Sequence, residues 1–288
     1  MGDVARVRDS EGEDWGPAGN VPPRQSIVTI YGLYGGASGN WMSVASLVHL
    51  IGDLGIDEAA VRSAVSRLKR GGMLESKSRG RAAGYCLSEG AEAMLRNGRE
   101  RIFQARRATL DEGWVLVVFS VPESDRAKRH TLRTELTRLG FGSVSSGVWI
   151  APGHVHDEVE AMLARLHLRS YTDIFRSDYL SVAPDLADKV RTWWDTESLQ
   201  ALYVRFLATH RPVVERLERG ETLSDAEAFA AHVRVLTDWR RLVYLDPGVA
   251  RELLPVKWSG TEASEVFDEL HARLAGPARR HVARVRSR

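Results

Sequence analysis

The densest concentration of positive charge lies between Ala60 and Gly84, where seven Lys or Arg residues stand against one acid, Glu75. The whole chain, by contrast, carries a net charge of only +2. Cations gathered in one short stretch suit the phosphates of a nucleic acid, because each phosphate that they neutralise releases condensed counterions. We therefore expect this stretch to bind double-stranded DNA. The seven cations are Arg62, Arg67, Lys69, Arg70, Lys77, Arg79 and Arg81.

The spacing within this stretch predicts a helix followed by a hairpin. Asp57 is a good N-cap, and apolar residues then recur with the period of a helix, which predicts one buried stripe. Serines and arginines share the opposite face, which suits a helix that enters a major groove. Gly71 and Gly72 end the helix, and segments 73–77 and 82–87 predict two short strands around a basic tip. The predicted buried stripe is Ala60, Val61, Ala64, Val65 and Leu68.

Two more helices should precede this one. Residues 26–35 form one amphipathic segment, and Ser43 can cap a second helix that runs to about Asp53, before a turn at Gly55. Helix, turn, helix and basic hairpin is the pattern of a winged helix-turn-helix, although a solvated basic helix is the plainer alternative. The expected contacts with base edges are Arg62, Ser63, Ser66 and Arg67. The expected contacts with phosphates or the flanking minor groove are Lys69, Arg70, Lys77, Arg79 and Arg81.

Composition places the chain among globular proteins and excludes several classes. Its 288 residues allow two or three domains, and 43% apolar and 27% charged residues are ordinary values. No apolar run is long enough to span a membrane, and no signal-peptide pattern opens the chain, so we expect a cytoplasmic protein. A single cysteine, Cys86, excludes intrachain disulfides and cysteine-built zinc sites.

The pattern of elements predicts an α+β multidomain protein. The middle of the chain has the order β-α-β-β-α-β, which is the ferredoxin-like arrangement, and the last third is all-α. We expect the basic end of the chain, residues 277–288, to fray. The predicted divisions are a disordered arm over 1–24, a winged helix DNA-binding domain over 25–88, a linker helix over 89–110, a ferredoxin-like domain over 111–182 and a helical regulatory, effector-binding domain over 183–288.

Three separated groups of motifs resemble one family, the PaaX-type transcriptional repressors of bacterial aromatic-acid catabolism (phenylacetic acid degradation repressor-like proteins). The similarity spans about residues 25–275, in the same order along the chain. Its motifs are Ile27–Gly32, Gly55–Ile56 and Ala60–Leu68 in the first domain, Leu132–Arg133, Glu135–Leu136, Leu139–Gly142 and Gly147–Pro152 in the second, and Trp239–Arg240, Leu245–Pro247, Glu252–Pro255, Trp258 and Gly260 in the third.

The resemblance implies a homodimeric repressor that binds a palindromic operator. It further implies an N-terminal winged helix, a middle domain similar to the CRISPR-associated small endoribonuclease fold and a C-terminal regulatory domain. Members of the family typically respond to an aryl-CoA thioester such as phenylacetyl-CoA. A two-fold dimer should prefer half-sites one or more helical turns apart, with about 34–36 Å per turn.

Aromatic and basic residues of the last two domains are candidates for the effector site. Indole rings can hold an aryl group, and guanidinium groups can meet an anionic part of the ligand. Core packing is the alternative explanation for each tryptophan. The candidate effector-binding residues are Trp149, Arg176, Trp239, Arg240 and Trp258.

We predict no catalytic residues, no metal and no cofactor, and we do not expect an enzyme. The endoribonucleases of the related fold place a metal-binding aspartate at the end of the first strand, where this chain has Val118–Pro122 without a carboxylate. His154 and His156 are better explained as polar residues before a helix. Two alternatives stay open: a metal-dependent nucleic-acid-processing enzyme that uses the middle domain, and an architectural DNA-binding dimer that needs no effector.

Overall fold

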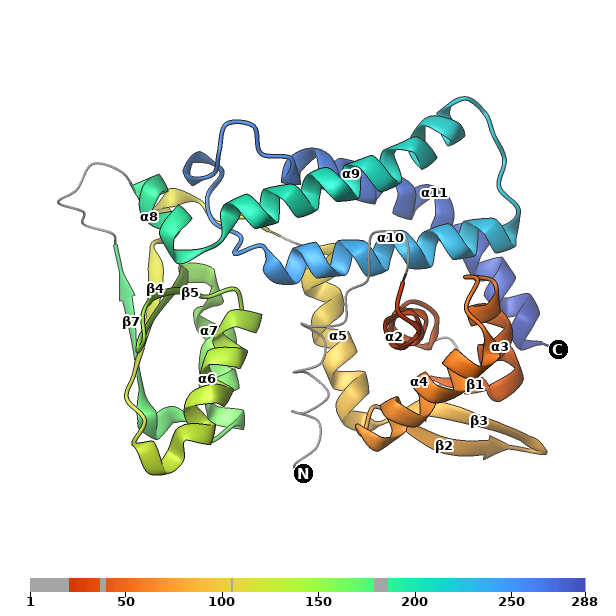
Figure 1. Cartoon of the computed structure of the whole chain (residues 1–288), viewed down its shortest axis with the longest axis horizontal. Coiled ribbons are helices and arrows are strands. Elements are labelled where there is room, and N and C mark those ends of the chain that lie inside the picture. Colours follow the sequence, from red (N-terminus) through yellow and green to blue (C-terminus); the bar gives the residue numbers. More distant parts are fainter. Residues whose placement is uncertain (1–20, 37–39, 105, 179–185, 288) are drawn as a thin grey trace. The chain divides into compact units, whose positions relative to one another are not determined.

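The computed structural model describes residues 21–36, 40–104, 106–178 and 186–287. These residues pack as two compact units, each built from separated segments of the chain. Helices and small sheets alternate in the first two thirds and helices alone follow (Figure 1), so the architecture is mixed α+β as predicted. Unit 1 comprises the described residues of Met1–Gln104, Val204–Arg240 and Thr261–Arg288, and unit 2 those of Ala105–Tyr203 and Arg241–Gly260.

Unit 1 combines the N-terminal helices and a small antiparallel sheet with long C-terminal helices. The first helix, α2, begins earlier than predicted, because Pro23 is well suited to a first helical turn. Residues 23 and 24 of the predicted disordered arm are therefore helical, and residues 1–20 of the arm lie outside the described residues. The N-terminal helices are α2 (Pro23–Tyr34), α3 (Val44–Gly52), α4 (Glu58–Arg70) and α5 (Glu89–Phe103). The strands are β1 (Trp41–Ser43), β2 (Leu74–Arg79) and β3 (Ala82–Leu87), in the order β1-β3-β2. The C-terminal helices are α9 (Thr196–Glu218), α10 (Asp225–Leu245) and α11 (Gly260–Arg286), of which unit 1 contains the parts within its ranges.

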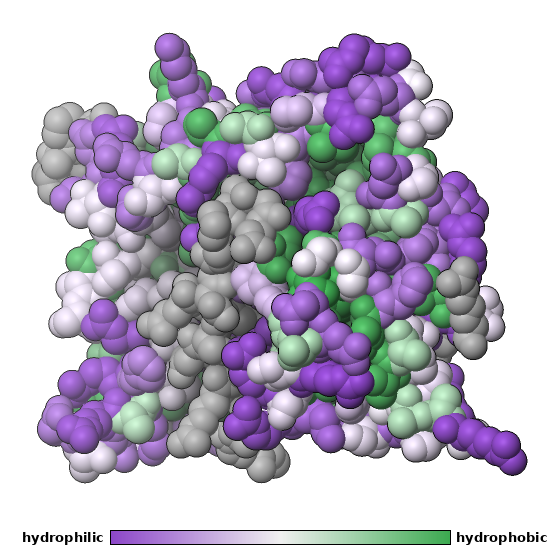
Figure 2. Space-filling model, turned by 45° about the vertical axis from the view of Figure 1, so that its right-hand side comes forward, coloured by the Kyte–Doolittle hydropathy of each residue, from purple (hydrophilic) through white to green (hydrophobic). Residues whose placement is uncertain are grey.

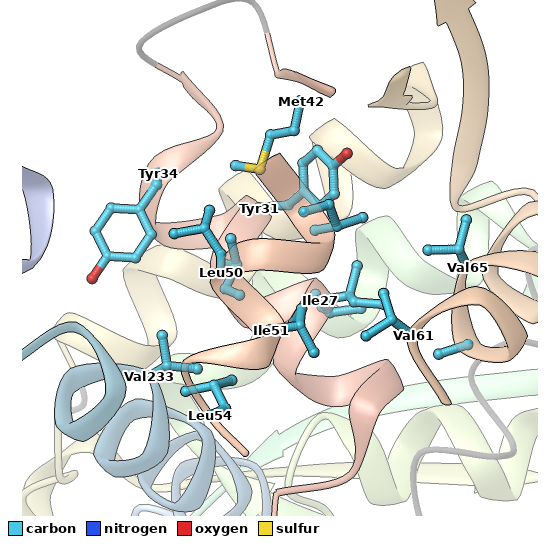
Figure 3. Close-up of a cluster of buried hydrophobic side chains, with 14 of the residues drawn as sticks. Ile27, Tyr31, Tyr34, Met42, Leu50, Ile51, Leu54, Val61, Val65 and Val233 are labelled. Atoms are coloured by element: carbon cyan, nitrogen blue, oxygen red, sulfur yellow. The ribbon is translucent and has the colours of Figure 1, made fainter. Parts of the chain in front are cut away.

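Helix α2 lies at the centre of the unit 1 core. Ile27 and Ile30 are fully buried, and Figure 3 shows Ile27 among side chains of α3 and α4. Val233 of α10 belongs to the same cluster, as do Val282 and Val285 of α11. The C-terminal helices therefore complete the core on which the predicted DNA-binding segment rests.

The expectation that residues 277–288 fray is wrong for its described part, because α11 continues to Arg286. The guanidinium of Arg286 donates to the carbonyl oxygens of Tyr34 at 3.0 Å and Trp41 at 2.6 Å. Apolar residues spaced along this helix, among them Val282 and Val285, are also buried. The basic sequence suggested a solvated tail, whereas its cations pair with groups from distant parts of the chain.

Unit 2 contains a four-stranded antiparallel sheet in the order β5-β6-β4-β7. The order of its elements along the chain is the predicted β-α-β-β-α-β. The strands are β4 (Trp114–Phe119), β5 (Gly142–Ser145), β6 (Val148–Pro152) and β7 (Thr172–Ser177). The helices are α6 (Arg126–Arg138), α7 (His156–Arg165) and α8 (Leu186–Trp193), together with the parts of α9 and α10 within its ranges. Short 3-10 turns occur at Leu110–Glu112, Glu123–Asp125, Gly153–Val155, Arg169–Tyr171 and Arg251–Leu253.

The two faces of this sheet differ in how they are covered. Val115 and Val117 of β4 are buried in a cluster with α6 and α7 residues such as Leu132. On the opposite face Trp114 lies beneath Trp194, with ring centroids 6.3 Å apart. A Cβ atom at Gly142 would stand 2.7 Å from the Trp194 ring, so this close approach requires glycine. The described residues leave the remainder of that face partly uncovered, since Leu116 and Val118 are half-buried and Phe175, opposite Leu116, is 53% exposed. One face of the sheet is thus buried in the core, and the other is partly exposed to solvent.

A chain of polar contacts crosses the core of unit 1 and predicts acid sensitivity. Tyr34 Oη lies 2.6 Å from Nδ1 of His232, whose Nε2 lies 2.9 Å from Nδ1 of His271. Burial, with a smaller contribution from the nearby His271 and Arg279 charges, lowers the pKa of His232 from 6.5 to about 3. Between these two pH values the unfolded chain binds the proton and the folded one does not, so stability should fall by about 1.4 kcal/mol per pH unit on acidification.

Urea unfolding across that pH range measures this effect. The variant His232→Asn removes the titrating group, and its unfolding free energy should depend less steeply on pH by about one proton. Equal slopes for the two proteins would show that His232 does not carry the effect.

Candidate nucleic-acid interface

Helix α4 begins and buries its apolar side as the sequence predicts. The carboxylate of Asp57 accepts a hydrogen bond from the backbone N–H of Ala60 at 2.9 Å, which satisfies one of the free donors of the first turn. The buried residues of the helix are Val61, Ala64, Val65 and Leu68, whereas Ala60 is only half-buried near the helix end. This anchoring fixes which face of α4 meets solvent.

The face opposite the core is basic and exposed along the whole helix. The sequence-predicted contacts on α4 are all exposed: Arg62, Ser63, Ser66, Arg67, Lys69 and Arg70. Nε of Arg62 donates to the Glu58 carboxylate at 2.8 Å, and both side chains are more than half exposed. An exposed pair one turn apart contributes only about 0.3–0.5 kcal/mol, so a phosphate or a base edge can replace Glu58 as the partner of Arg62. The face is therefore available to an anionic partner.

The β2–β3 hairpin extends the basic surface beyond the helix. Gly80 has φ +57° at its turn, a conformation that glycine adopts without strain. Lys77, Arg79 and Arg81 are all exposed. In Figure 2 the hairpin tip stands out as a hydrophilic projection at the lower right. The second group of predicted DNA contacts thus lies on one small, projecting element.

Trp41 of β1 supports the hairpin, a role that the sequence did not reveal. Its indole N–H donates to the carbonyl of Lys77 at 2.7 Å, and the Arg79 guanidinium lies 5.1 Å from its ring centroid. A Cβ atom at Gly84 would stand 2.4 Å from the Met42 carbonyl oxygen, so β1 and β3 approach closely only because this residue is glycine. The hairpin is consequently held by the sheet beneath it.

All nine predicted DNA-binding residues lie in unit 1, on α4 and on the hairpin that directly follows it. The ammonium group of Lys69 lies 5.7 Å from the ring centroid of Tyr85 on β3, which links the two elements. The surface combines small hydroxyls with cations, and such a surface can hydrogen-bond base edges and neutralise phosphates. The chemical capacity of these groups is hydrogen bonding and charge neutralisation, which suits recognition of a nucleic acid.

The five candidate effector residues are divided between the units, so no single unit holds them all. In unit 1, Trp239 stacks on Phe267 with centroids 4.8 Å apart, and neighbouring Arg240 is buried. In unit 2, Trp149 is buried in the sheet core and Arg176 is exposed on β7, while Trp258 packs edge-on against Tyr203. Their role as effector ligands stays a prediction.

Unit 1 contains a cavity of about 410 Å³ that none of these five residues lines. Its walls come from α9, α10 and α11, with Asp53 from the end of α3. Apolar residues provide most of the wall, and its charged residues are two arginines, Arg216 and Arg234, and two acids, Asp53 and Glu227. Pockets of about 300–1,000 Å³ with a few polar groups commonly bind small molecules. The apolar lining is Val213, Leu223, Ala226, Ala230, Ala231, Val235, Leu270 and Leu274.

The middle sheet carries no nuclease-like carboxylate where the related enzymes place one. Strand β4 ends at Phe119 and is followed by Ser120. His156 pairs with the adjacent Asp157 at 2.9 Å, and His154 lies 3.5 Å from Glu112. Within the described residues, neither histidine belongs to a group of three metal-ligating side chains.

Comparisons with known proteins match most of the chain to one family. Three family models match in succession: PaaX-like protein over residues 23–91, PaaX protein central Cas2-like domain over 107–188, and PaaX-like protein C-terminal domain over 194–284. The Transcriptional repressor PaaX of Escherichia coli K12 is 27% identical over 266 residues, which cover 90% of this chain and 83% of that protein. The solved structure of the uncharacterized protein Rv0674 from Mycobacterium tuberculosis has a TM-score of 0.57 and 22% identity over 89% of this chain and 97% of that one, which shows a similar fold.

The succession of matched domains defines a multidomain transcriptional regulator. The chain belongs to the PaaX family, as its sequence motifs indicated. The named relative is a repressor, which supports the expectation of a regulator and not an enzyme. Among the described residues, no helix is long and apolar enough to cross a membrane.

Proposed function

We propose that the protein is a homodimeric transcriptional repressor that binds operator DNA through a winged helix-turn-helix and releases it in response to an aryl-CoA-type effector. The observation that carries this proposal is the exposed basic face of α4, anchored by a buried apolar stripe and continued by the basic hairpin. The similarity to a transcriptional repressor adds independent support.

In this proposal α3 and α4 are the helix-turn-helix and α4 enters the major groove. Arg62, Ser63, Ser66 and Arg67 meet base edges, because they lie on the face opposite the core. Lys69 and Arg70, together with the hairpin cations, meet phosphates or the adjacent minor groove. The phosphate contacts position the helix on the duplex, and the base contacts determine which DNA sequence it prefers.

The open face of the unit 2 sheet supports dimerisation. We assign it to a second copy of this chain, because Phe175, Leu116 and Val118 leave apolar surface on a ferredoxin-like sheet whose strand β7 is an unpaired edge in the described chain. A two-fold pair would bury the same face of both copies and present two α4 helices to a palindromic operator.

The unit 1 cavity supports a route from effector to DNA. Arg234 lines it and donates to the Leu54 carbonyl at 3.1 Å, and Leu54 lies in the turn between α3 and α4. An acidic group that pairs with Arg234 would withdraw this support and favour an arrangement of α4 that no longer fits the operator. The cavity is therefore a second candidate for the effector site, besides the five residues predicted from the sequence.

The experiment that tests the proposal selects duplexes from a random-sequence pool with the full-length protein. We expect enrichment of a palindrome, and phenylacetyl-CoA should release the selected duplex whereas free coenzyme A should not. If no sequence is enriched, the result would favour the alternative of an architectural DNA-binding dimer without sequence preference. Failure of every aryl-CoA tested would remove the effector assignment alone.

The hairpin contribution predicts a specific salt dependence. Arg81→Ala removes one exposed cation, so it should weaken binding to all duplexes alike and reduce the slope of log affinity against log salt by about one unit. The matched control is Lys257→Ala, which removes another exposed cation, outside the proposed interface. Unchanged slopes in both variants would place the hairpin away from DNA.

A further inference from the structure

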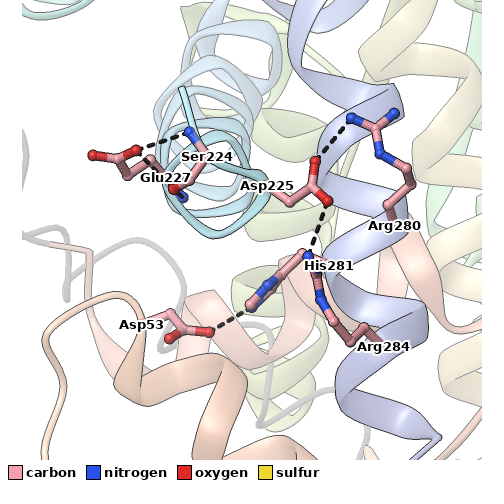
Figure 4. Close-up of polar contacts among 7 residues, drawn as sticks. All are labelled: Asp53, Ser224, Asp225, Glu227, Arg280, His281 and Arg284. Carbon is pink, nitrogen blue, oxygen red and sulfur yellow. Dashed lines mark hydrogen bonds and ion pairs between the residues drawn. The ribbon is translucent and has the colours of Figure 1, made fainter. Parts of the chain in front are cut away.

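Three side chains of types that ligate metal ions meet in unit 1, and only Asp53 among them also lines the proposed effector cavity. His49 and Asp53 lie four residues apart at the end of α3, and His281 comes from α11. Nε2 of His281 lies 2.7 Å from Oδ2 of Asp53, and Nε2 of His49 lies 3.9 Å from the same oxygen. One ligand atom from each of the three residues lies within 4.8 Å of the others. Figure 4 shows the His281 ring directed at Asp53 across the gap between the two helices.

The types and distances of these groups suit a divalent transition-metal ion. Two imidazoles and one carboxylate, with a fourth position for water, form a common set of zinc ligands. Tetrahedral ligands at zinc distances lie about 3.3 Å apart, so the 2.7 Å and 3.9 Å separations bracket the required value. Small rotations of His49 would bring all three atoms to one ion.

The surroundings keep these ligands available. Arg280 and Arg284, the neighbouring cations on α11, both pair with Asp225, at 2.8 Å and 2.9 Å (Figure 4). They therefore do not occupy the Asp53 carboxylate. The ring of His281 packs on Phe229 with centroids 5.4 Å apart, which fixes its direction, whereas His49 is 45% exposed and leaves a path for the ion.

We propose that His49, Asp53 and His281 bind one divalent ion of the zinc class, which joins α11 to the helix that precedes α4. Coordination would replace the single His281–Asp53 hydrogen bond by three bonds to one centre. The ion would thus stabilise the attachment of the C-terminal helix to the DNA-binding segment. This role is structural and is independent of which sequence α4 reads.

Calorimetric titration of the chelator-treated, full-length protein with Zn²⁺ tests the site. We expect one ion per chain and a rise of Tm on binding. His49→Ala should weaken binding at least about tenfold and abolish the rise of Tm. This variant leaves the Asp53–His281 hydrogen bond in place, so it should fold without metal. His156→Ala removes a histidine that also pairs with an aspartate but has no third ligand, and it should bind as the wild type does.

Co²⁺ in place of Zn²⁺ gives a second readout, because its visible absorption reports a site with few ligands and nitrogen donors. Asp53→Asn should lose this absorption, although an amide oxygen can still accept the hydrogen bond of His281. The proposal is overturned if the protein binds no stoichiometric ion, or if His49→Ala binds Zn²⁺ as tightly as the wild type.

Discussion

Arg67→Ala should abolish most of the preference of the protein for its selected duplex. Arg67 lies at the middle of the exposed face of α4, and its side chain has no hydrogen-bond or ion-pair partner among the described residues. Its guanidinium is free to make two hydrogen bonds to one guanine, and loss of such a pair costs about 1–3 kcal/mol. Titration of the variant with selected and scrambled duplexes should show a large loss for the first and a small loss for the second.

Arg70→Ala provides the matched control on the same helix. Arg70 is the last residue of α4 and is proposed to meet phosphates, so its loss should weaken binding to both duplexes by a similar factor. If Arg67→Ala also weakens both duplexes equally, α4 does not read bases through this residue. Arg62→Ala should have a smaller effect than Arg67→Ala, because Arg62 must first leave Glu58.

Phe175→Asp should prevent formation of the proposed dimer and leave the protein monomeric. The ring is 53% exposed on the open face of the unit 2 sheet, and a carboxylate there would be desolvated against apolar side chains of a second copy. Without a partner, each α4 binds one half-site, and the affinity for a palindromic duplex should fall roughly 100-fold or more because the second contact is no longer intramolecular. Analytical ultracentrifugation measures the first effect and titration of the palindrome measures the second.

Leu110→Asp is the control for this substitution. Leu110 is 55% exposed in the same unit and lies outside the sheet, so its change to aspartate also removes an exposed apolar side chain and adds one negative charge. We expect it to leave the dimer and its DNA affinity unchanged. If Phe175→Asp also remains dimeric, the two copies associate through another surface.

The surface features of α4 were predictable because they depend on residues close together in sequence. The period of Val61, Ala64 and Leu68 defines the buried stripe, and the positions of the arginines on the opposite face follow from it. The same locality applies to β2 and β3, where glycines and a short apolar pattern mark a hairpin. The three groups of motifs also predicted correctly that the chain belongs to the PaaX family.

Contacts between distant segments could not be predicted in the same way. The basic end of α11 suggested a solvated tail, because nothing in its sequence reveals that Arg280 and Arg284 meet Asp225 or that Arg286 meets the carbonyl of Trp41. The sequence likewise does not indicate that His49 and His281, which are far apart in the chain, lie beside the same carboxylate, that of Asp53. Trp239 and Trp258, two of the predicted effector residues, belong to different units, and their role as effector ligands stays a prediction.

The central claim, that α4 reads bases in the major groove, is tested most directly by methylation interference on the selected duplex. Methylation of guanine N7 places a methyl group in the major groove, where Arg67 is proposed to donate. The account predicts that modification at two symmetric groups of guanines, one or more helical turns apart, prevents binding by the wild type, and that Arg67→Ala loses this sensitivity at one position in each half-site. Binding that tolerates N7 methylation at every guanine of the duplex would contradict it.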